Sequence, residues 1–212
     1  MTRVIGHLDF WIDFASTYSY LSAMRIEEEA RQHGVAVRWR PFLLGPIFAE
    51  QGWNDSPFNI YPAKGRYMWR DLERRCARHG LPFRRPAAGD DKAFPRRSLL
   101  AGRVALAVLD EPWGPEFCRR VYMAEFAEWL DIGDPAVIET CLEQARGAAD
   151  GFRVNDVAEV HKAALKANVD EAVALGIFGA PSFSIDGEVF WGDDRLEDAL
   201  DWAAGKARAA KE

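Results

Sequence analysis

Cysteine and histidine are scarce in this chain, and neither is arranged for a metal site or a disulfide. The three cysteines, Cys76, Cys118 and Cys141, are odd in number, far apart and embedded in helical patterns. This spacing fits reduced, packed thiols better than a disulfide scaffold or a metal site, and a reactive cysteine is the less favoured alternative. The four histidines are scattered and lack a nearby paired nucleophile. A metalloenzyme and a Ser-His-Asp hydrolase are therefore disfavoured.

Surplus positive charge and long apolar runs are also missing. The formal net charge is −6 at pH 7, which argues against nucleic acid as a partner, because non-specific binding needs surplus lysine and arginine to displace counterions. No apolar run is long enough to span a bilayer, so a membrane partner is not expected. Residues 1–3 lead directly into a strand pattern without an apolar leader segment. We therefore expect a cytoplasmic protein.

The chain does contain enough apolar residues for a core and a strand-helix-strand pattern near its start. It has 212 residues, of which 49% are hydrophobic and 28% are charged, as in ordinary globular proteins. Apolar residues alternate with other residues over 8–14 and 35–40, which is the period of half-buried strands. The pattern between them predicts a helix over residues 18–33 that ends at Gly34. A right-handed crossover with parallel strands is expected.

The middle of the chain is predicted to be a loop followed by several helices. Residues 45–59 are rich in glycine, proline, asparagine and serine, and this composition predicts a loop or linker. The helical patterns after it cover residues 61–79, 97–109, 115–130, 135–145 and 155–175. Short strands beginning at Ser182 and Glu188 and a last helix over residues 194–204 complete the prediction.

Two motifs near opposite ends of the chain bear on function. Pro181 stands directly before a short apolar run, and residues 186–187 (DG) turn that run back, which predicts a proline-initiated hairpin. A proline entering a strand lacks a ladder donor, which suits a backbone edge that stays free to meet a ligand. Near the N-terminus an apolar strand runs into residues 16–19 (STYS) and then a helix. Thioredoxin-like proteins place their redox motif in this order, and here both cysteine positions are serine.

The chain resembles the DsbA-like branch of the thioredoxin superfamily, and within it the glutathione-dependent 2-hydroxychromene-2-carboxylate isomerases and the kappa-class glutathione transferases. The resemblance covers nearly the whole chain. It rests on the order and spacing of residues 13–21 (DFASTYSYL), 40–45 (RPFLLG), 62–68 (PAKGRYM), 178–183 (FGAPSF) and 190–196 (FWGDDRL). The family usually carries proline after the first serine, where this chain has Thr17.

The resemblance implies an α/β protein with a thioredoxin-like fold and an inserted all-helical domain, the arrangement of DsbA. Residues 1–44 and 176–212 would form the thioredoxin-like domain, and residues 45–175 the inserted helical domain. The resemblance also implies glutathione as the cofactor, an aromatic small molecule as the substrate, and a homodimer.

Ser16 has two interpretations. Between a strand and a helix, a serine is a good N-cap, because its hydroxyl accepts a hydrogen bond from an unpaired backbone N–H. The alternative, which we favour because the other motifs accompany it, is catalytic. A helix N-terminus lowers the pKa of a thiol held there, and a serine hydroxyl can donate a hydrogen bond to the thiolate. Serine cannot exchange disulfides, so the sulfur would come from the glutathione that the resemblance implies.

The other residues of the predicted site follow from the resemblance. It implies that the Ala180-Pro181 peptide bond is cis and that the backbone of Ala180 meets the cysteinyl part of glutathione as an added strand. Asp194 would pair with the γ-glutamyl ammonium. Asp193 would stand where a serine or asparagine often binds the γ-glutamyl carboxylate, a role to which a second carboxylate is poorly suited. For both aspartates, the structural alternative is an acidic first turn of the last helix.

Two further contacts are predicted on the segments after the second strand. Asn54 is a candidate contact with the tripeptide, and Lys64 would supply charge for a carboxylate. Lys64 begins a helix on which arginines recur every fourth residue over 66–78, and a solvated stripe is the default explanation of that pattern. Asp71 is expected to face Arg75 at the same spacing.

The activity that the resemblance implies is glutathione-dependent isomerisation of 2-hydroxychromene-2-carboxylate-like aromatic acids by reversible thiolate addition and elimination. Two alternatives stay open. One is a kappa-class-like transferase, which conjugates glutathione to an electrophile. The other, from a different class, is a non-catalytic thioredoxin-fold protein that binds peptides in its groove.

Overall fold

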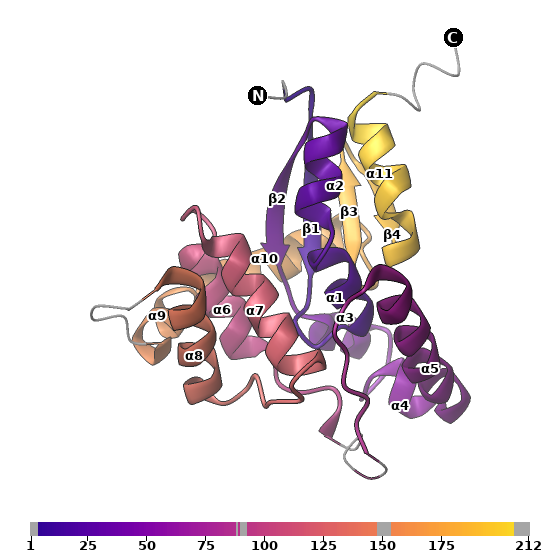
Figure 1. Cartoon of the computed structure of the whole chain (residues 1–212), viewed down its shortest axis with the longest axis vertical. Coiled ribbons are helices and arrows are strands. Elements are labelled where there is room, and N and C mark those ends of the chain that lie inside the picture. The colour runs from indigo at the N-terminus through magenta and orange to yellow at the C-terminus, as the bar shows by residue number, and fades with distance from the viewer. Residues whose placement is uncertain (1–3, 88, 90–92, 148–153, 206–212) are drawn as a thin grey trace.

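The protein is built on a mixed four-stranded sheet (Figure 1). The computed structural model describes residues 4–87, 89, 93–147 and 154–205, so the predictions for residues 1–3 and 206–212 lie outside the described part. The strands are β1 (Gly6–Ile12), β2 (Val35–Pro41), β3 (Ser182–Ile185) and β4 (Glu188–Trp191). Their order is β2-β1-β3-β4, with β1 parallel to β2 and antiparallel to β3. The predicted parallel pairing is therefore confirmed.

Helices cover both faces of this sheet because its strands carry apolar side chains in both directions. The helices α1 (Thr17–Ala23) and α2 (Ile26–His33) connect β1 to β2, and α11 (Leu196–Ala203) ends the described chain. α2 and α11 lie side by side over one face (Figure 1), where Phe10 stacks on Phe183 with 5.4 Å between ring centroids. On the opposite face, Trp11 packs in a second buried cluster with residues of α10.

The segment between β2 and β3 is helical. It contains α3 (Leu44–Glu50), α4 (Pro57–Ile60), α5 (Pro62–His79), α6 (Leu99–Val108), α7 (Gly114–Phe126), α8 (Pro135–Arg146), α9 (Val154–Val160) and α10 (Lys162–Ala174). One buried cluster runs from the strands into these helices: Phe14 packs on Tyr122 and Tyr20 on Phe126, with centroids 5.1 and 5.5 Å apart. The helices thus pack directly on the sheet unit, and the division at residues 45 and 175 stays a prediction.

The predicted loop over residues 45–59 is wrong in part, because it holds α3 and α4. Pro46 lies in the first turn of α3 and Pro57 in that of α4, where a proline costs no hydrogen bond. Ile47 buries its side chain in the cluster around Trp11, and this tertiary contact stabilises a helix that the turn-forming composition concealed.

Two of the predicted continuous helices are broken. The helix predicted over residues 18–33 is divided at Met24 and Arg25, and the one predicted over 155–175 is divided at His161. The helix predicted over 115–130 ends at Phe126, just before Trp129 with its φ of 61°. The last helix begins as a 3₁₀ turn, η2 (Asp193–Arg195), rather than as an α-helix at residue 194. The periodicity located these helices but not the points at which the backbone turns between them.

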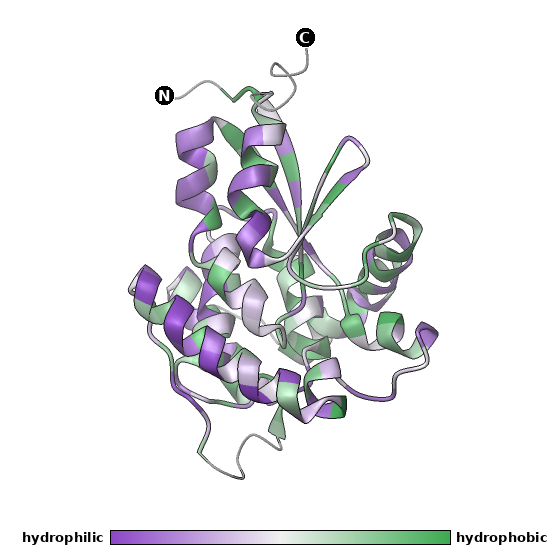
Figure 2. Cartoon of the chain, turned by 90° about the vertical axis from the view of Figure 1, so that its right-hand side faces the viewer, coloured by the Kyte–Doolittle hydropathy of each residue, from purple (hydrophilic) through white to green (hydrophobic). Residues whose placement is uncertain are grey.

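The helix that carries the arginine stripe has a hydrophilic outer side. Figure 2 shows hydrophilic residues along the outer sides of the helices in the part of the molecule where α5 lies. The arginines that recur over residues 66–78 are exposed, as expected of a solvated stripe. Within the described part of the chain, no helix combines the length and apolar character needed to cross a membrane.

The three cysteines are free and buried, which confirms the prediction of packed thiols. Burial raises the pKa of the Cys76 and Cys141 thiols to about 12, and it raises the pKa of Cys118 as well. At neutral pH all three are therefore protonated, and a protonated, inaccessible thiol is a poor nucleophile.

Glu125 on α7 is a buried carboxyl group. Its Oε2 atom lies 3.4 Å from Nη1 of Arg96, and its Oε1 atom has no hydrogen-bond partner among the described residues. Burial raises the pKa of Glu125 to about 8, and the charge of Arg96 opposes this shift. The folded protein therefore holds this proton more tightly than the unfolded chain does.

Stability is expected to fall as the pH rises from about 4.5, the ordinary pKa of this carboxyl, to about 8, its folded value. Below this window the carboxyl is protonated in both states, and above it only the folded state bears the cost of a buried charge. Glu125→Gln should flatten the curve of melting temperature against pH over this window. Glu139→Gln, on the exposed face of α8, is the control. An unchanged curve in Glu125→Gln would contradict the assignment.

Candidate active site

Ser16 joins the two ends of the chain. It is the N-cap of α1, with φ −85° and ψ 117°, and its Oγ accepts a hydrogen bond from the Ser19 N–H at 3.3 Å. The same Oγ donates to the carbonyl oxygen of Ala180 at 2.9 Å. The capping interpretation of Ser16 is thus confirmed. α1 begins at Thr17, so a threonine at the position usually held by proline is accommodated in the helix.

The loop before β3 presents its backbone to Ser16. The Ala180–Pro181 peptide bond is cis, as the resemblance implied. A side chain at Gly179 would place its Cβ 2.3 Å from Nε1 of Trp191, so only glycine lets the loop lie this close to β4. The Gly192 N–H donates to the carbonyl of Pro181 at 3.0 Å. The loop is therefore held by Ser16 on one side and by the end of β4 on the other, near the C-terminal end of β1.

Asp13 fixes the floor of this site, and sequence reasoning did not select it. Its side chain is buried, and its two carboxylate oxygens accept hydrogen bonds from the backbone N–H groups of Ala15 at 3.0 Å and Leu44 at 2.8 Å. Its carbonyl accepts the N–H of Ser16 at 2.9 Å. Burial raises the pKa of Asp13, opposed by hydrogen bonds from Leu44, Ser98 and Ala15. The sequence feature that could have pointed to Asp13 is its position as an aspartate at the end of an apolar strand.

Tyr18 lies on the first turn of α1 and faces α5. Its hydroxyl donates to Oδ2 of Asp71 at 3.2 Å, and its ring packs near Phe58, with 6.4 Å between centroids. Burial and the Asp71 carboxylate raise the pKa of Tyr18, so the phenol stays protonated at neutral pH. Asp71 also accepts a hydrogen bond from Arg74. The expected pairing of Asp71 with Arg75 is not formed.

Arg75 instead reaches Asp193. The Asp193 side chain is only 1% exposed: its Oδ1 accepts from Ser22 Oγ at 2.9 Å and from Arg25 Nη2 at 3.0 Å, and its Oδ2 accepts from Arg75. Sequence reasoning treated Asp193 as a carboxylate facing the ligand. In the structure it faces the protein interior, and two guanidinium groups neutralise its charge.

Asp194, by contrast, is open to solvent. Its side chain is 57% exposed, and its Oδ2 lies 3.3 Å from Nη2 of the equally accessible Arg195. Gly192 precedes the turn with φ 110°, a conformation that glycine adopts without strain. A Cβ there would lie 2.6 Å from Oδ1 of Asp194, so glycine also leaves room for this carboxylate. Two adjacent aspartates thus have opposite environments.

Asn54 and Lys64 lie on the segments after β2. Asn54 is exposed between α3 and α4. Lys64 is exposed in the first turn of α5, with its Nζ 4.7 Å from the ring centroid of Tyr61. α5 contacts both α1 and α4, so Lys64 stands on a helix next to the one that Ser16 caps, and Asn54 lies in the segment that precedes α4. Ligand contact stays a prediction for both.

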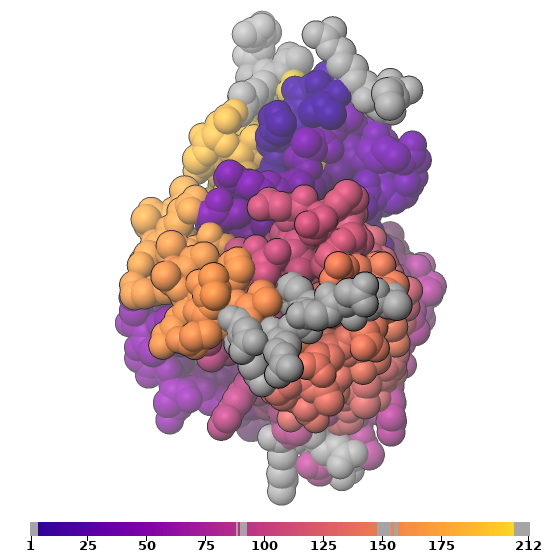
Figure 3. All heavy atoms as spheres, turned by 90° about the vertical axis from the view of Figure 1, so that its left-hand side faces the viewer, coloured from indigo at the N-terminus to yellow at the C-terminus, as the bar shows by residue number. Residues whose placement is uncertain are grey.

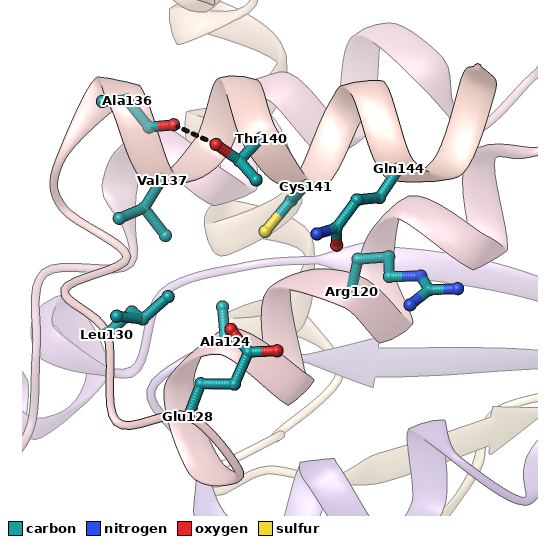
Figure 4. Close-up of a pocket in the computed structure, with 9 residues that line it drawn as sticks. All are labelled: Arg120, Ala124, Glu128, Leu130, Ala136, Val137, Thr140, Cys141 and Gln144. Atoms are coloured by element: carbon teal, nitrogen blue, oxygen red, sulfur yellow. Dashed lines mark hydrogen bonds between the residues drawn. The ribbon is translucent and has the colours of Figure 1, made fainter.

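Two cavities differ in their relation to these residues. One, of about 190 Å³, lies between α7 and α8 (Figure 4) and is lined by Arg120, Glu128 and Cys141 among others. None of the predicted site residues lines it. Inside α8, the Thr140 hydroxyl next to it is already bonded to the carbonyl of Ala136. This small cavity is therefore not part of the site.

The larger cavity, of about 640 Å³, is lined by residues of α3, α6, α9 and α10 and by Leu43. α9 and α10, in orange, lie on the side of the molecule seen in Figure 3. Leu43 precedes Leu44, whose N–H binds Asp13, and Leu99 follows Ser98, which also bonds to Asp13. None of the predicted site residues lines this cavity either, but it has the size of a small-molecule pocket, and Leu43 and Leu99 are next in sequence to residues that bond to Asp13.

The sheet order, the cis-proline before β3 and the serine that caps α1 together define a thioredoxin-fold protein with serine in place of the redox cysteines. The sequence pattern of the DSBA-like thioredoxin domain matches residues 7–201, and the chain belongs to this family. Among the described residues, no group of three or more histidines, cysteines, aspartates or glutamates is placed to hold a metal ion.

Sequence and structure similarity to known proteins supports this assignment. The chain is 27% identical over 199 residues to the 2-hydroxychromene-2-carboxylate isomerase of Sphingobium xenophagum, covering 93% of this chain and 96% of that protein. It is 27% identical over 209 residues to glutathione S-transferase kappa 2 of Caenorhabditis elegans, covering 92% and 90%. A solved structure of 2-hydroxychromene-2-carboxylate isomerase is similar in fold, with a TM-score of 0.80, 22% identity and 97% of both chains covered. The predicted family and α/β fold are confirmed.

Proposed function

We propose that this protein is a glutathione-dependent isomerase of 2-hydroxychromene-2-carboxylate-like aromatic acids. The observation that carries the proposal is the hydrogen bond from Ser16 Oγ to the carbonyl of Ala180, beside a cis-proline and at a helix start. It brings a hydroxyl donor within reach of a backbone edge that can take up a peptide strand. The names of the curated relatives, an isomerase and a kappa-class transferase, support the same reading.

The donor set fits glutathione group by group. The exposed carboxylate of Asp194 suits the γ-glutamyl ammonium, and the exposed ammonium of Lys64 suits a carboxylate of the tripeptide. Asn54 offers an amide to the backbone of the ligand. Ser16 offers its hydroxyl to the sulfur. Asp194 and Lys64 are thus assigned to the ammonium and to one of the two carboxylates of the tripeptide.

Ser16 has a different partner in the proposed complex. The main chain of the tripeptide aligns with Ala180, and a ligand N–H takes the carbonyl that the Ser16 hydroxyl now occupies. The released hydroxyl donates to the thiolate. The first-turn N–H groups of α1 add positive potential, which no acidic residue in that turn offsets. Both effects favour the thiolate over the thiol.

Glutathione supplies the nucleophilic sulfur, which adds to the conjugated double bond of the substrate so that the bond can rotate, and leaves again by elimination. The chain binds the tripeptide, holds the sulfur ionised and places an aromatic acid beside it. The cavity of about 640 Å³ next to the residues that bond to Asp13 is large enough to hold an aromatic acid. The proposal further includes the cytoplasm as the compartment, a homodimer, and the two-part division of the chain.

Titration calorimetry with glutathione tests the proposal first. Binding in the millimolar range or tighter supports an enzyme that uses glutathione, and no binding at saturating concentrations sinks the proposal. Product analysis then separates the activities. Isomerisation of a chromene acid with recovery of free glutathione supports the isomerase, whereas stable conjugation to a halogenated nitrobenzene supports the transferase. Glutathione binding without turnover of either substrate supports a binding protein.

The protein is also expected to fail as a disulfide oxidoreductase. Ser16 and Ser19 stand at the two cysteine positions, and a serine oxygen does not take part in thiol exchange. The buried, protonated cysteines offer no substitute. An insulin-reduction assay with dithiothreitol measures this, and the variant with Cys76, Cys118 and Cys141 replaced by alanine is the control. Reductase activity that survives in that variant would overturn the prediction.

A further inference from the structure

A buried charge cluster, formed by Arg25, Arg75, Asp193 and Ser22, lies beneath the predicted ligand site. Arg25 stands at the junction of α1 and α2, Arg75 near the C-terminal end of α5, and Asp193 in the 3₁₀ turn before α11. The side chain of Arg25 is 11% exposed and that of Arg75 is 27% exposed. Three elements that are remote in sequence therefore meet at one carboxylate.

This cluster fixes the position of the Asp193 side chain more than it stabilises the folded protein. Removing charges from water is costly, and a buried ion pair often only offsets that cost. All three hydrogen bonds are directional, however: Ser22 and Arg25 donate to Oδ1 of Asp193, and Arg75 donates to Oδ2. With both oxygens bonded inside the protein, Asp193 is not available to bind a ligand directly.

The residue that follows, Asp194, is the exposed one. Because Asp193 and Asp194 share a peptide unit in the 3₁₀ turn, the anchored side chain sets where the free carboxylate stands. The same anchor reaches α5, which begins next to Lys64, and α1, which Ser16 caps. The cluster thus ties together the three elements that carry Ser16, Lys64 and Asp194.

We propose that Asp193, clamped by Arg25 and Arg75, is a positioning residue that holds Asp194 in place to recognise the γ-glutamyl ammonium of glutathione. This inference rests on the proposed function. It replaces the direct ligand contact expected of Asp193 with an indirect one, in which the carboxylate acts through its neighbour.

Two ligands test the clamp. Calorimetry gives the affinities of glutathione and of cysteinylglycine, which lacks the γ-glutamyl group. The affinity for glutathione divided by the affinity for cysteinylglycine measures recognition of the γ-glutamyl group. Asp194→Asn should lower the ratio about tenfold or more, as expected for loss of a charged hydrogen bond. Asp193→Asn should lower it about fivefold, and the double variant should lie within about twofold of Asp194→Asn alone, because both changes disable one interaction.

A purely structural role predicts a different result. Both affinities would then fall together in Asp193→Asn, with their ratio unchanged. Asp198→Asn is the matched control, since it removes an exposed carboxylate from the first turn of α11, which follows the 3₁₀ turn, and leaves the clamp intact. Its ratio should equal that of the wild type.

Arg75→Lys provides a second route if Asp193→Asn does not fold, which circular dichroism would reveal. Lysine keeps the charge but not the planar fork, so the ratio should again fall. An unchanged ratio in the folded clamp variants, with a fall in Asp194→Asn, overturns the inference and leaves the proposed function standing. A wild-type protein that does not bind glutathione overturns both, and the first titration identifies that case.

Discussion

Replacing Ser16 with alanine is expected to lower turnover at pH 7 by about 100-fold, the effect of removing one donor aimed at a developing or resident anion. Without the hydroxyl, the pKa of bound glutathione rises, and less thiolate is present at neutral pH. The affinity for glutathione should fall far less, because most contacts lie along the tripeptide. The deficit should shrink as the pH rises, since solvent then deprotonates the thiol unaided.

Two measurements separate this role from capping. Titration of the thiolate absorbance in the ultraviolet gives the pKa of bound glutathione in both proteins, and melting curves give the cost of the lost cap, about 1 kcal/mol. Asp134→Ala, which removes the N-cap of α8, is the control for capping alone and should leave turnover unchanged. Equal thiol pKa values and equal turnover in wild type and Ser16→Ala would reduce Ser16 to a cap.

Replacing Asp13 with alanine is expected to destabilise the protein by about 3 kcal/mol or more. The carboxylate satisfies the backbone N–H groups of Ala15 and Leu44, and each buried donor left unpaired costs about 1–3 kcal/mol. For a chain of this size, that loss lowers the melting temperature by roughly 6–12 °C. Urea denaturation and thermal melting at pH 7 measure the effect.

Asp13→Asn is the informative companion variant. The amide retains one oxygen acceptor but presents its NH₂ group to the second N–H donor, so the destabilisation should be smaller than in Asp13→Ala and still clear. The folded fraction of either variant should also bind glutathione less well, because the loop that carries Ser16 has lost hydrogen bonds to the Asp13 side chain that support it. A loss below about 1 kcal/mol in Asp13→Ala would mean that water or a rearranged loop replaces the carboxylate.

Local patterns predicted the parts of the site whose physics is local. Ser16 before an apolar helix face is an N-cap on any fold, and Pro181 before a short apolar run marks the start of a strand that needs no donor there. Both were placed correctly. The order and spacing of the motifs then identified the family, because both can be taken directly from the sequence without knowledge of the tertiary structure.

The errors arose where distant contacts outweighed local preference. Residues 45–59 have the composition of a loop, but burial of Ile47 against Trp11 stabilises α3 there. Arg75 was assigned to Asp71, four residues earlier on its own helix, which is the usual partner by spacing. The chain brings Asp193 closer to it, from a segment over 100 residues away in sequence.

The sequence by itself determined the fold class, the family and the identity of the residue that caps the first helix, because these depend on periodicity and on motifs read along one chain. Only the tertiary structure decided which polar groups meet. It set the Ser16 hydroxyl on the carbonyl of Ala180, gave Asp13 its place beneath the loop, and separated two adjacent aspartates into a buried anchor and an exposed carboxylate. Side-chain direction and burial decide those roles, and both depend on packing between elements that no local pattern encodes.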